Sequence, residues 1–180
     1  MQNILVSIYC TAYNHEKYIA DAIDSFLVHQ TNFKYEILIH DDASIDIIRE
    51  YEKKYPDLIK PIDQTENQYS KIGITTVDKI NFDRALRKYI AVCKGDDYWT
   101  DQYKLQKQID YMESHPECSL CVHAGYVVSA VNKKKQDINR TNKGEKLGFK
   151  RKLILYIDNI VQVSLNFFRN RRGWNSWVLR

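Results

Sequence analysis

Three short apolar runs in this chain are each followed directly by a polar turn, and this repeated order restricts the fold more than any other feature. The runs lie at residues 4–10, 35–39 and 88–93, and the turns read TAYN, HDDAS and KGDDYW. Runs of this length are too short for helices and are typical of buried strands. A pattern of apolar residues at helical spacing follows each turn. The sequence therefore predicts strand, turn and helix units in series.

The alternation of strands and helices predicts the α/β class, with a mostly parallel central sheet. We expect Asn14 to cap a first helix that begins at His15, because asparagine is a favoured N-cap residue. The remaining expected elements are helices over 46–55, 76–87 and 101–114, strands over 58–62 and 119–128, and a helical turn with one strand within 154–168.

The chain has 180 residues and a formal net charge of +4. This length suits one ordinary domain, and so mild a charge argues against a nucleic-acid binder. The positive residues gather in the last third, at 133–135, 150–152 and 169–172. They form either a solvated face or a surface for an anionic membrane or acceptor. We divide the chain into a ligand-binding domain over 1–128 and an incomplete region over 129–180 that continues it.

The sequence contains no run of about 20 apolar residues, so we expect no membrane span. The N-terminus lacks the basic and apolar regions of a signal peptide, and four cysteines without such a signal suggest a reducing cytoplasm. The stretch HPECSLCVH offers four zinc-ligand types. We favour buried structural cysteines there, because a strand would place Cys121 and His123 on one face in poor tetrahedral geometry.

The three turns are the candidate site, because ligands of open α/β sheets bind at the carboxyl ends of the strands. Asp96 and Asp97 would form a hard oxygen site for Mg²⁺ or Mn²⁺. Asp42 could accept a hydrogen bond from a base or a ribose, and Tyr13 could lie against a base ring. Together they indicate a nucleotide diphosphate bound through a metal. Taken singly, the acidic pair could instead be a helix cap or a solvated turn, and Tyr13 could be a packing residue.

Common alternatives for an α/β nucleotide or ester site are missing from the sequence. The glycine-rich fingerprint of dinucleotide-binding folds does not follow the first strand, and the P-loop pattern does not occur. The Gly-x-Ser-x-Gly elbow of α/β hydrolases does not occur either.

The segments VSIYCTAYNHEKYIADAIDSFLVHQ, EILIHDDASID and KYIAVCKGDDYWTDQYKLQKQIDYMESHPE resemble the family 2 glycosyltransferases in order and rough spacing. The resemblance covers about residues 6–123, with a fainter echo at VQVSLNFFRN. It implies the GT-A fold, a Rossmann-like three-layer α/β/α sandwich. It also implies a nucleotide-sugar donor, with a UDP-sugar expected.

The resemblance implies roles for individual residues. Thr11, Tyr13 and Asn14 match the segment that holds the nucleobase, with Tyr13 stacking on it, and Asp42 matches a residue that contacts the base. The motif GDDYW would place Asp96 near the ribose and sugar, and Asp97 on a Mn²⁺ or Mg²⁺ ion at the diphosphate. Lys71 lies in the loop where the family often carries a basic residue near the phosphates.

The implied reaction is a single displacement in which an acceptor hydroxyl attacks the anomeric carbon, inverts it and gives its proton to a carboxylate base. The acceptor would be a saccharide or a lipid-linked molecule of bacterial surface polysaccharide synthesis. We expect a cytoplasmic chain, with peripheral contact at the inner face of the membrane. An exposed sheet edge could also support a homodimer.

The end of the sequence departs from the family pattern. The base usually lies beyond the segment that VSLNFFRN resembles, whereas Asp158 is the last carboxylate here and is a weak candidate. We therefore expect a chain truncated at the C-terminus. One alternative function is a donor-binding fragment without a base. Another is a sugar nucleotidyltransferase, although no glycine- and lysine-rich loop for a triphosphate follows the first strand.

Overall fold

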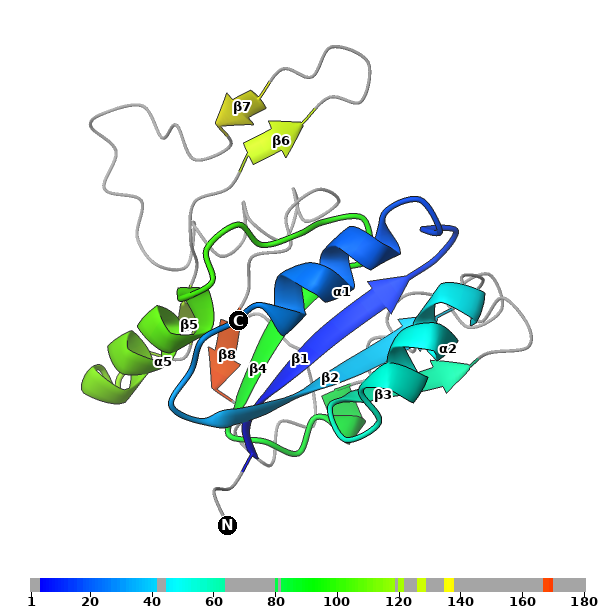
Figure 1. Cartoon of the computed structure of the whole chain (residues 1–180). Helices are drawn as coiled ribbons and strands as arrows, with labels where there is room; N and C mark the ends of the chain where they lie inside the picture. Colours follow the sequence, from blue (N-terminus) through cyan, green and yellow to red (C-terminus); the bar gives the residue numbers. More distant parts are fainter. Residues whose placement is uncertain are drawn as a thin grey trace. The chain divides into compact units, whose positions relative to one another are not determined.

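The computed structural model describes residues 4–41, 45–63, 80, 82–118, 120–121, 126–128, 135–137 and 167–169. Its main sheet has the strand order β3-β2-β1-β4-β8-β5, and β6 pairs with β7 in a second sheet (Figure 1). The strands are β1 (Ile4–Ala12), β2 (Lys34–Asp41), β3 (Ile59–Asp63), β4 (Tyr89–Lys94), β5 (Leu120–Cys121), β6 (Tyr126–Val128), β7 (Lys135–Asp137) and β8 (Phe167–Arg169). The helices are α1 (Ile19–Leu27), α2 (Ile45–Lys54) and α5 (Lys104–Ser114).

The first four strands of the main sheet are parallel, as the alternation of strands and helices predicts. β8 is antiparallel to both β4 and β5 and lies between them. The single strand expected over 119–128 is wrong: residues there form β5 and β6, which belong to different sheets. The partners decide this, because β5 pairs with β8 whereas β6 pairs with β7.

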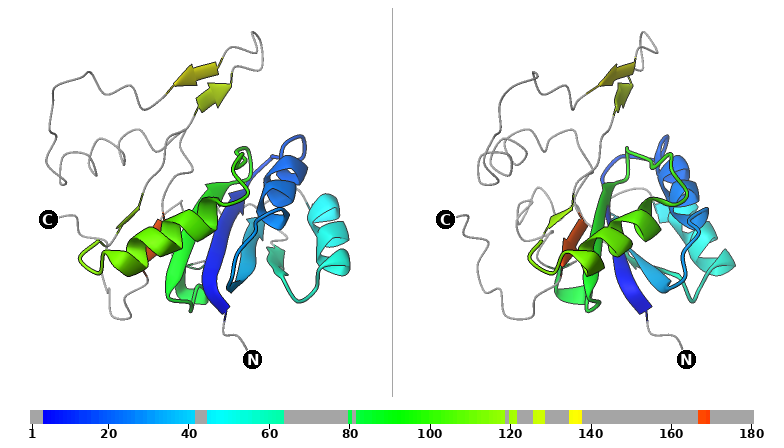
Figure 2. Two further views of the ribbon diagram at one scale, coloured as in Figure 1. Left: turned by 60° about the vertical axis from the view of Figure 1, so that its left-hand side comes forward. Right: turned by 90° about the vertical axis from the view of Figure 1, so that its left-hand side faces the viewer.

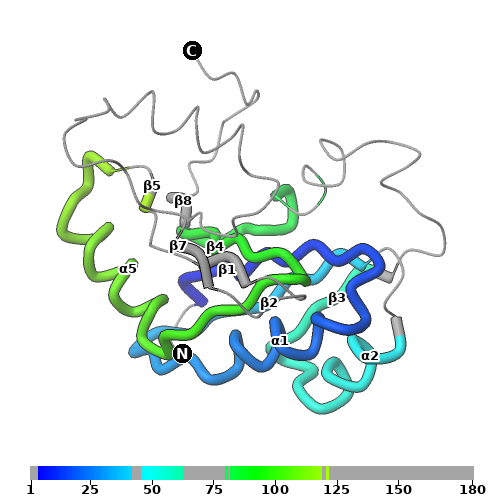
Figure 3. The backbone as a smooth tube through the Cα atoms, turned by 90° about the horizontal axis from the view of Figure 1, so that it is seen from above, coloured from blue at the N-terminus to red at the C-terminus, as the bar shows by residue number. Residues whose placement is uncertain are grey.

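One face of the main sheet packs against helices and forms the larger apolar core. Within α1, Ile19, Ala22, Ile23 and Phe26 of the predicted apolar stripe are fully buried, and Leu27, its last member, is partly buried. Figures 1 and 3 show α1 and α2 side by side on this face, and Figure 2 gives two further views of the arrangement. Leu105, Ile109 and Met112 of α5 belong to the same core. The helices thus form a layer on one side of the sheet.

The other face of the sheet is covered by a second, smaller apolar cluster. It contains Tyr9, Leu38 and Ile90 from three neighbouring strands, together with Ala85. The ring of Phe82 lies 5.0 Å from that of Tyr9, measured between centroids. Residues 80 and 82–84 are helical, so a helical segment covers this face. The helix expected to reach residue 87 ends before residue 85, where the chain turns into β4.

The chain divides into two compact units, Met1–Cys121 with Asn166–Arg180, and Val122–Leu165. The division at residue 128 that the sequence suggested stays a prediction. Within the described ranges, no helix has the length and apolar character needed to cross a membrane.

Candidate functional site

The carboxyl ends of β1, β2 and β4 lie next to one another at one edge of the main sheet. β1 is the middle strand of the three: its Ala12 pairs with Asp41 of β2, and its Thr11 pairs with Lys94 of β4. The segments that follow these strands therefore leave the sheet at the same edge. This is the location that the sequence predicted for a ligand site.

The turn after β1 exposes Tyr13, which keeps 44% of its surface accessible. Asn14 takes a left-handed backbone conformation with φ of 59°, which asparagine tolerates better than most residues. The prediction that Asn14 caps a helix from His15 is wrong, because α1 begins at Ile19 after Tyr18, which makes no side-chain cap. The residues assigned to the first helical turn instead form a turn in which the N–H groups of Tyr18 and Ile19 both donate to the carbonyl of His15, at 2.8 and 2.9 Å. Tyr13 thus stands partly exposed at the edge of the sheet.

The turn after β4 is fastened by the backbone to the end of β1, directly before the turn that exposes Tyr13. The N–H of Gly95 donates to the carbonyl of Thr11 at 2.8 Å, and the N–H of Asp97 donates to the carbonyl of Lys94 at 3.1 Å. Gly95 is buried in this turn. A Cβ at Gly95 would lie 2.9 Å from the Cβ of Ala12 and 3.1 Å from the Nδ1 of His15. The absence of a side chain on Gly95 therefore allows the two turns to approach.

Side chains also join the two turns. The Nε2 of His15 lies 3.8 Å from an Oδ2 of Asp96, whose side chain is about half exposed. Asp97 is partly buried, and its carbonyl accepts a weak hydrogen bond from the thiol of Cys93 at 3.7 Å. The structure thus brings Thr11, Tyr13 and Asn14 together with the acidic pair, which is the grouping that the sequence predicted.

The acidic residues of the edge surround a buried thiol. Burial raises the pKa of the Cys10 thiol well above its usual value, and the neighbouring Cys93 thiol and the carboxylates of Asp96, Asp41 and Asp97 raise it further. Asp41 is the last residue of β2 and is fully buried. Three carboxylates are therefore close enough to act on one thiol.

Three predicted site residues lie outside the described residues: Asp42, Lys71 and Asp158. Asp42 directly follows the described Asp41 at the end of β2. The structure gives no position for these three side chains, so their roles stay predictions.

A metal at this edge would have few protein ligands. Within the described residues, no group of three or more His, Cys, Asp or Glu side chains could hold an ion. Asp96 and Asp97 are adjacent and accessible to solvent. This donor set fits a divalent ion that is held by one or two carboxylates and whose coordination shell is completed by water and phosphate oxygens. It does not fit a closed all-protein site.

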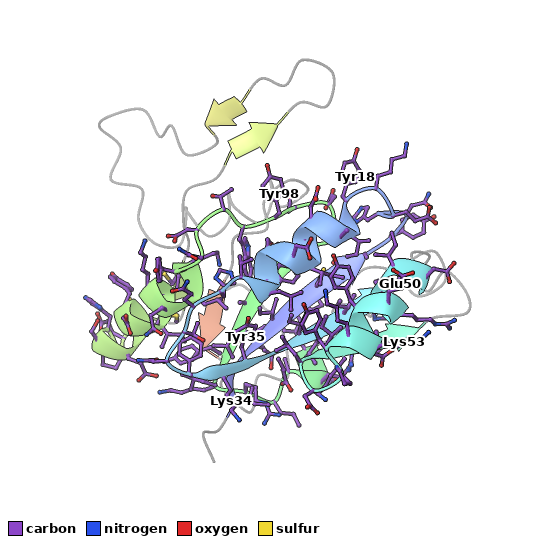
Figure 4. The ribbon with its side chains drawn as sticks, in the orientation of Figure 1. Tyr18, Lys34, Tyr35, Glu50, Lys53 and Tyr98 are labelled. Carbon is purple, nitrogen blue, oxygen red and sulfur yellow. The ribbon has the colours of Figure 1, made fainter. Side chains whose placement is uncertain are left out.

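Exposed tyrosines line the same end of the sheet. Figure 4 shows Tyr18 and Tyr98 in the upper part of the view, above α1, whereas Lys34 and Tyr35 at the start of β2 lie in the lower part. Tyr18 and Tyr98 both expose about half of their surface. Their rings are therefore available for contact with a ligand beside the acidic turn.

Sequence reasoning missed two residues that shape the site, His15 and Gly95, and it did not single out the buried Lys104. His15 and Gly95 form contacts only because two turns about 80 residues apart meet at one edge. Lys104 did leave a signal in the sequence, because it shares the buried face of α5 with Gln108 and Met112, four and eight residues further on. A lysine in such a row is a candidate buried charge.

Comparison with known proteins shows the family of this chain and its fold. A protein of Mycobacterium tuberculosis of uncharacterized function is 42% identical over 127 residues, which cover 68% of this chain and 36% of that protein. S. aureus TarS, solved with UDP-GlcNAc, superposes with a TM-score of 0.54 at 21% identity, covering 65% of this chain and 33% of TarS. The mannosyltransferase PcManGT from Pyrobaculum calidifontis, solved with GDP-Man and Mn²⁺, gives a TM-score of 0.54 at 16% identity, covering 67% and 37%.

The two structural similarities show the fold, which is the GT-A arrangement that the resemblance implied. The chain spans about a third of the length of the curated relatives it matches. The family model described as glycosyl transferase family 2 matches residues 7–174. This chain therefore belongs to glycosyltransferase family 2.

Proposed function

We propose that this chain binds a nucleotide diphosphate sugar at the carboxyl edge of its main sheet and transfers the sugar to an acceptor hydroxyl. The observation that carries the proposal is the hydrogen bond from the N–H of Gly95 to the carbonyl of Thr11. It places the acidic turn beside the turn that exposes Tyr13. An aromatic ring and a pair of carboxylates on adjoining turns suit the base and the diphosphate of one nucleotide.

Each residue at the edge has a proposed role in binding the donor. Tyr13 stacks on the base, because its ring is exposed. Thr11 and Asn14 contact the nucleoside beside Tyr13, and Asp96 binds the ribose or the sugar. Asp42 and Lys71 stay part of this proposal, for the base and the phosphates. A UDP-sugar is the donor that we favour, in line with the UDP-GlcNAc complex of TarS.

We assign Asp97 to a divalent cation, Mn²⁺ or Mg²⁺. The mannosyltransferase from P. calidifontis was solved with Mn²⁺, which supports the choice of ion. When bound, such an ion neutralises the negative charge that develops on the departing nucleoside diphosphate. The part of this chain is to hold the two carboxylates and to orient the donor.

The proposed reaction is a single displacement with inversion. The acceptor oxygen forms a bond to the anomeric carbon while the bond from that carbon to the phosphate oxygen breaks, and the proton of the hydroxyl passes to a carboxylate base. None of the described residues is assigned as this base. Asp158 remains a weak candidate.

The setting of the reaction is also a proposal. We place the protein in bacterial surface polysaccharide synthesis, on the cytoplasmic side, with a saccharide or lipid-linked acceptor. Peripheral contact with the membrane and formation of a homodimer belong to the same proposal.

Calorimetry of UDP binding, with and without Mn²⁺, tests the donor site. We expect Mn²⁺ to strengthen binding by at least about tenfold and Asp97→Asn to remove that gain. Asp57→Asn is the matched control, because Asp57 is exposed in the turn after α2. If the Kd for UDP changes neither with Mn²⁺ nor with the Asp97 substitution, the site assignment is wrong. GDP is titrated in parallel to test the choice of base.

Product analysis separates the competing functions. Sugar transfer from UDP-GlcNAc or UDP-glucose to a saccharide acceptor supports the proposed enzyme. Metal-dependent UDP binding without transfer to any acceptor supports the donor-binding fragment instead. Release of pyrophosphate from a nucleoside triphosphate and a sugar phosphate would identify a nucleotidyltransferase.

A further inference from the structure

Lys104 is a buried lysine whose charge faces an aromatic ring. It is the first residue of α5, yet only 7% of its surface is exposed. Its Nζ lies 3.8 Å from the centroid of the Trp99 ring and donates to the Oε1 of Gln108 at 2.7 Å. Among the residues that the structure describes, no carboxylate forms an ion pair with it. The face of Trp99 and the side-chain amide of Gln108 are therefore the contacts of this cation within the described residues.

The surroundings of Lys104 come from several elements. Burial lowers its pKa to about 7, while Cys93 of β4, Cys121 of β5 and Asp101 each act in the opposite direction. Burial lowers the pKa of His29, just beyond α1, and the positive charge of Lys104 also acts to lower it. Burial of a charged lysine lowers the free energy of unfolding. We therefore expect a function that the ammonium performs and an apolar side chain would not.

Trp99 has no polar anchor of its own within the described residues. Its indole Nε1 is buried without a hydrogen-bond partner there, and 5% of the residue is exposed. The ring packs on Phe26 at 4.9 Å and on His29 at 5.2 Å, measured between ring centroids. Its position is thus set by aromatic contacts from α1 on one side and by the ammonium group of Lys104 on the other.

The segment that contains Trp99 connects the acidic turn to α5. Figure 1 shows it leaving the end of β4 and running beside α1 towards α5. It is fastened again at Gln102, whose carbonyl accepts from the N–H of Gln30 at 2.9 Å and lies 3.0 Å from the Nδ1 of His29. Trp99 is only two residues beyond Asp97. Displacement of its ring would therefore move the backbone that carries both carboxylates.

We propose that Lys104 is a positioning residue that holds Trp99 by its ring face and thereby fixes the Asp96–Asp97 turn for the diphosphate and its metal. Lys104 touches neither donor nor metal, and it acts through Trp99. This inference rests on the proposed donor site and adds a residue to it that the strand-end turns do not contain.

The first test is a double-mutant cycle on Mn²⁺-dependent UDP binding, with Lys104→Met, Trp99→Leu and the double variant. Methionine keeps an unbranched side chain of similar length and loses the charge. We expect each single variant to raise the Kd for UDP with Mn²⁺ by about tenfold. The Kd of the double variant should be little higher than that of either single variant, because both substitutions break the same Lys104–Trp99 contact. Lys53→Met, an exposed lysine of α2, is the control and should bind as wild type does.

Three outcomes of the cycle bear directly on the inference. A Kd for Lys104→Met equal to that of wild type overturns it, and so do strictly additive effects of the two substitutions. Loss of Mn²⁺-independent UDP binding to the same extent would also contradict it, because only the carboxylate turn should be displaced. Thermal melts of every variant confirm that the folded protein is being titrated.

The second test does not depend on the donor site. The tryptophan fluorescence of wild type is measured from pH 5.5 to 9, and the part that is missing from the Trp99→Phe variant is assigned to Trp99. We expect a transition near pH 7 that disappears in Lys104→Met and persists in His29→Gln, which removes the imidazole beside the same ring. A transition unchanged by Lys104→Met means that the ammonium does not hold this ring, and the inference fails. If instead the transition behaves as expected and wild type shows no metal-dependent UDP binding, the proposed function fails while the Lys104–Trp99 contact stands.

Discussion

The imidazole Nε2 of His15 lies 3.8 Å from the carboxylate Oδ2 of Asp96, although 80 residues separate the two in the sequence. His15 belongs to the turn after β1, and Asp96 to the turn after β4. The contact therefore joins the aromatic half of the candidate donor site to its acidic half. The two halves thus approach through these side chains and are joined by the backbone bond from Gly95 to Thr11.

His15→Ala should weaken donor binding more than it weakens the fold. Without the imidazole, Asp96 loses a neighbour that restricts its carboxylate. We expect the Kd for UDP with Mn²⁺ to rise by about threefold to tenfold, measured by calorimetry. His115→Ala at the end of α5 is the matched control and should leave the Kd unchanged. If both variants bind UDP as wild type does, His15 has no part in orienting Asp96.

Gly95→Ala should destabilise the protein by about 1–3 kcal/mol, because the new Cβ would stand 2.9 Å from the Cβ of Ala12. That contact involves two atoms close to the backbone, so rotation of a side chain cannot relieve it. Urea denaturation measures the loss. The double variant Ala12→Gly, Gly95→Ala removes the contact and should recover part of the stability. A single variant as stable as wild type would show that the two turns do not approach as described.

Lys104→Met should change the dependence of stability on pH. Burial lowers the pKa of Lys104 in the folded protein to about 7, against an ordinary value of 10.5. Between these two pH values the unfolded chain binds more protons at this lysine than the folded chain does. Lys104 therefore makes the free energy of unfolding of wild type rise as the pH rises. The destabilisation caused by the buried charge of Lys104 is fully present below pH 7 and is lost as the pH approaches 10.5.

We therefore expect the variant to be more stable than wild type at pH 7 and its advantage to shrink by up to about 1.4 kcal/mol per pH unit above that. Urea unfolding of both proteins at pH 7, 8 and 9 gives the comparison. A constant difference across this range would contradict the lowered pKa. A variant that is more stable yet binds UDP less well would separate the role of Lys104 in the site from its effect on folding.

Arg87→Met should be costly because it leaves a buried carboxylate without its main partner. The Arg87 guanidinium donates to both oxygens of Glu36, at 2.9 and 3.2 Å, and Ser7 donates to the first of them at 2.8 Å. Arg87 is partly exposed, which reduces the effect, and we expect a loss of about 2 kcal/mol in urea denaturation.

A surface ion pair provides the control for Arg87. Lys88 lies 2.6 Å from Glu113, and both side chains are about half exposed. Lys88→Met should therefore cost less than about 1 kcal/mol. Equal losses for the two variants would mean that burial of Glu36 does not set the cost.

The local patterns of the sequence predicted the elements that carry the site. Short apolar runs with polar turns at their ends predicted β1, β2 and β4, and helical spacing predicted the buried side of α1. These features depend on residues a few positions apart, so periodicity and turn chemistry reveal them. The position of Asp96 and Asp97 directly after a strand was predictable for the same reason.

Contacts between distant segments were decided by the tertiary structure alone. The left-handed turn at Asn14 replaces the first turn of the expected helix, and β8 enters the sheet between β4 and β5. His15 meets Asp96 because β1 and β4 are neighbours in the sheet, and Lys104 meets Trp99 because α5 packs back on the same core. Strand order and packing bring these pairs together, and no pattern within one segment encodes them. The sequence alone thus determined which residues stand at the strand ends, and the packing of the sheet decided which of them touch.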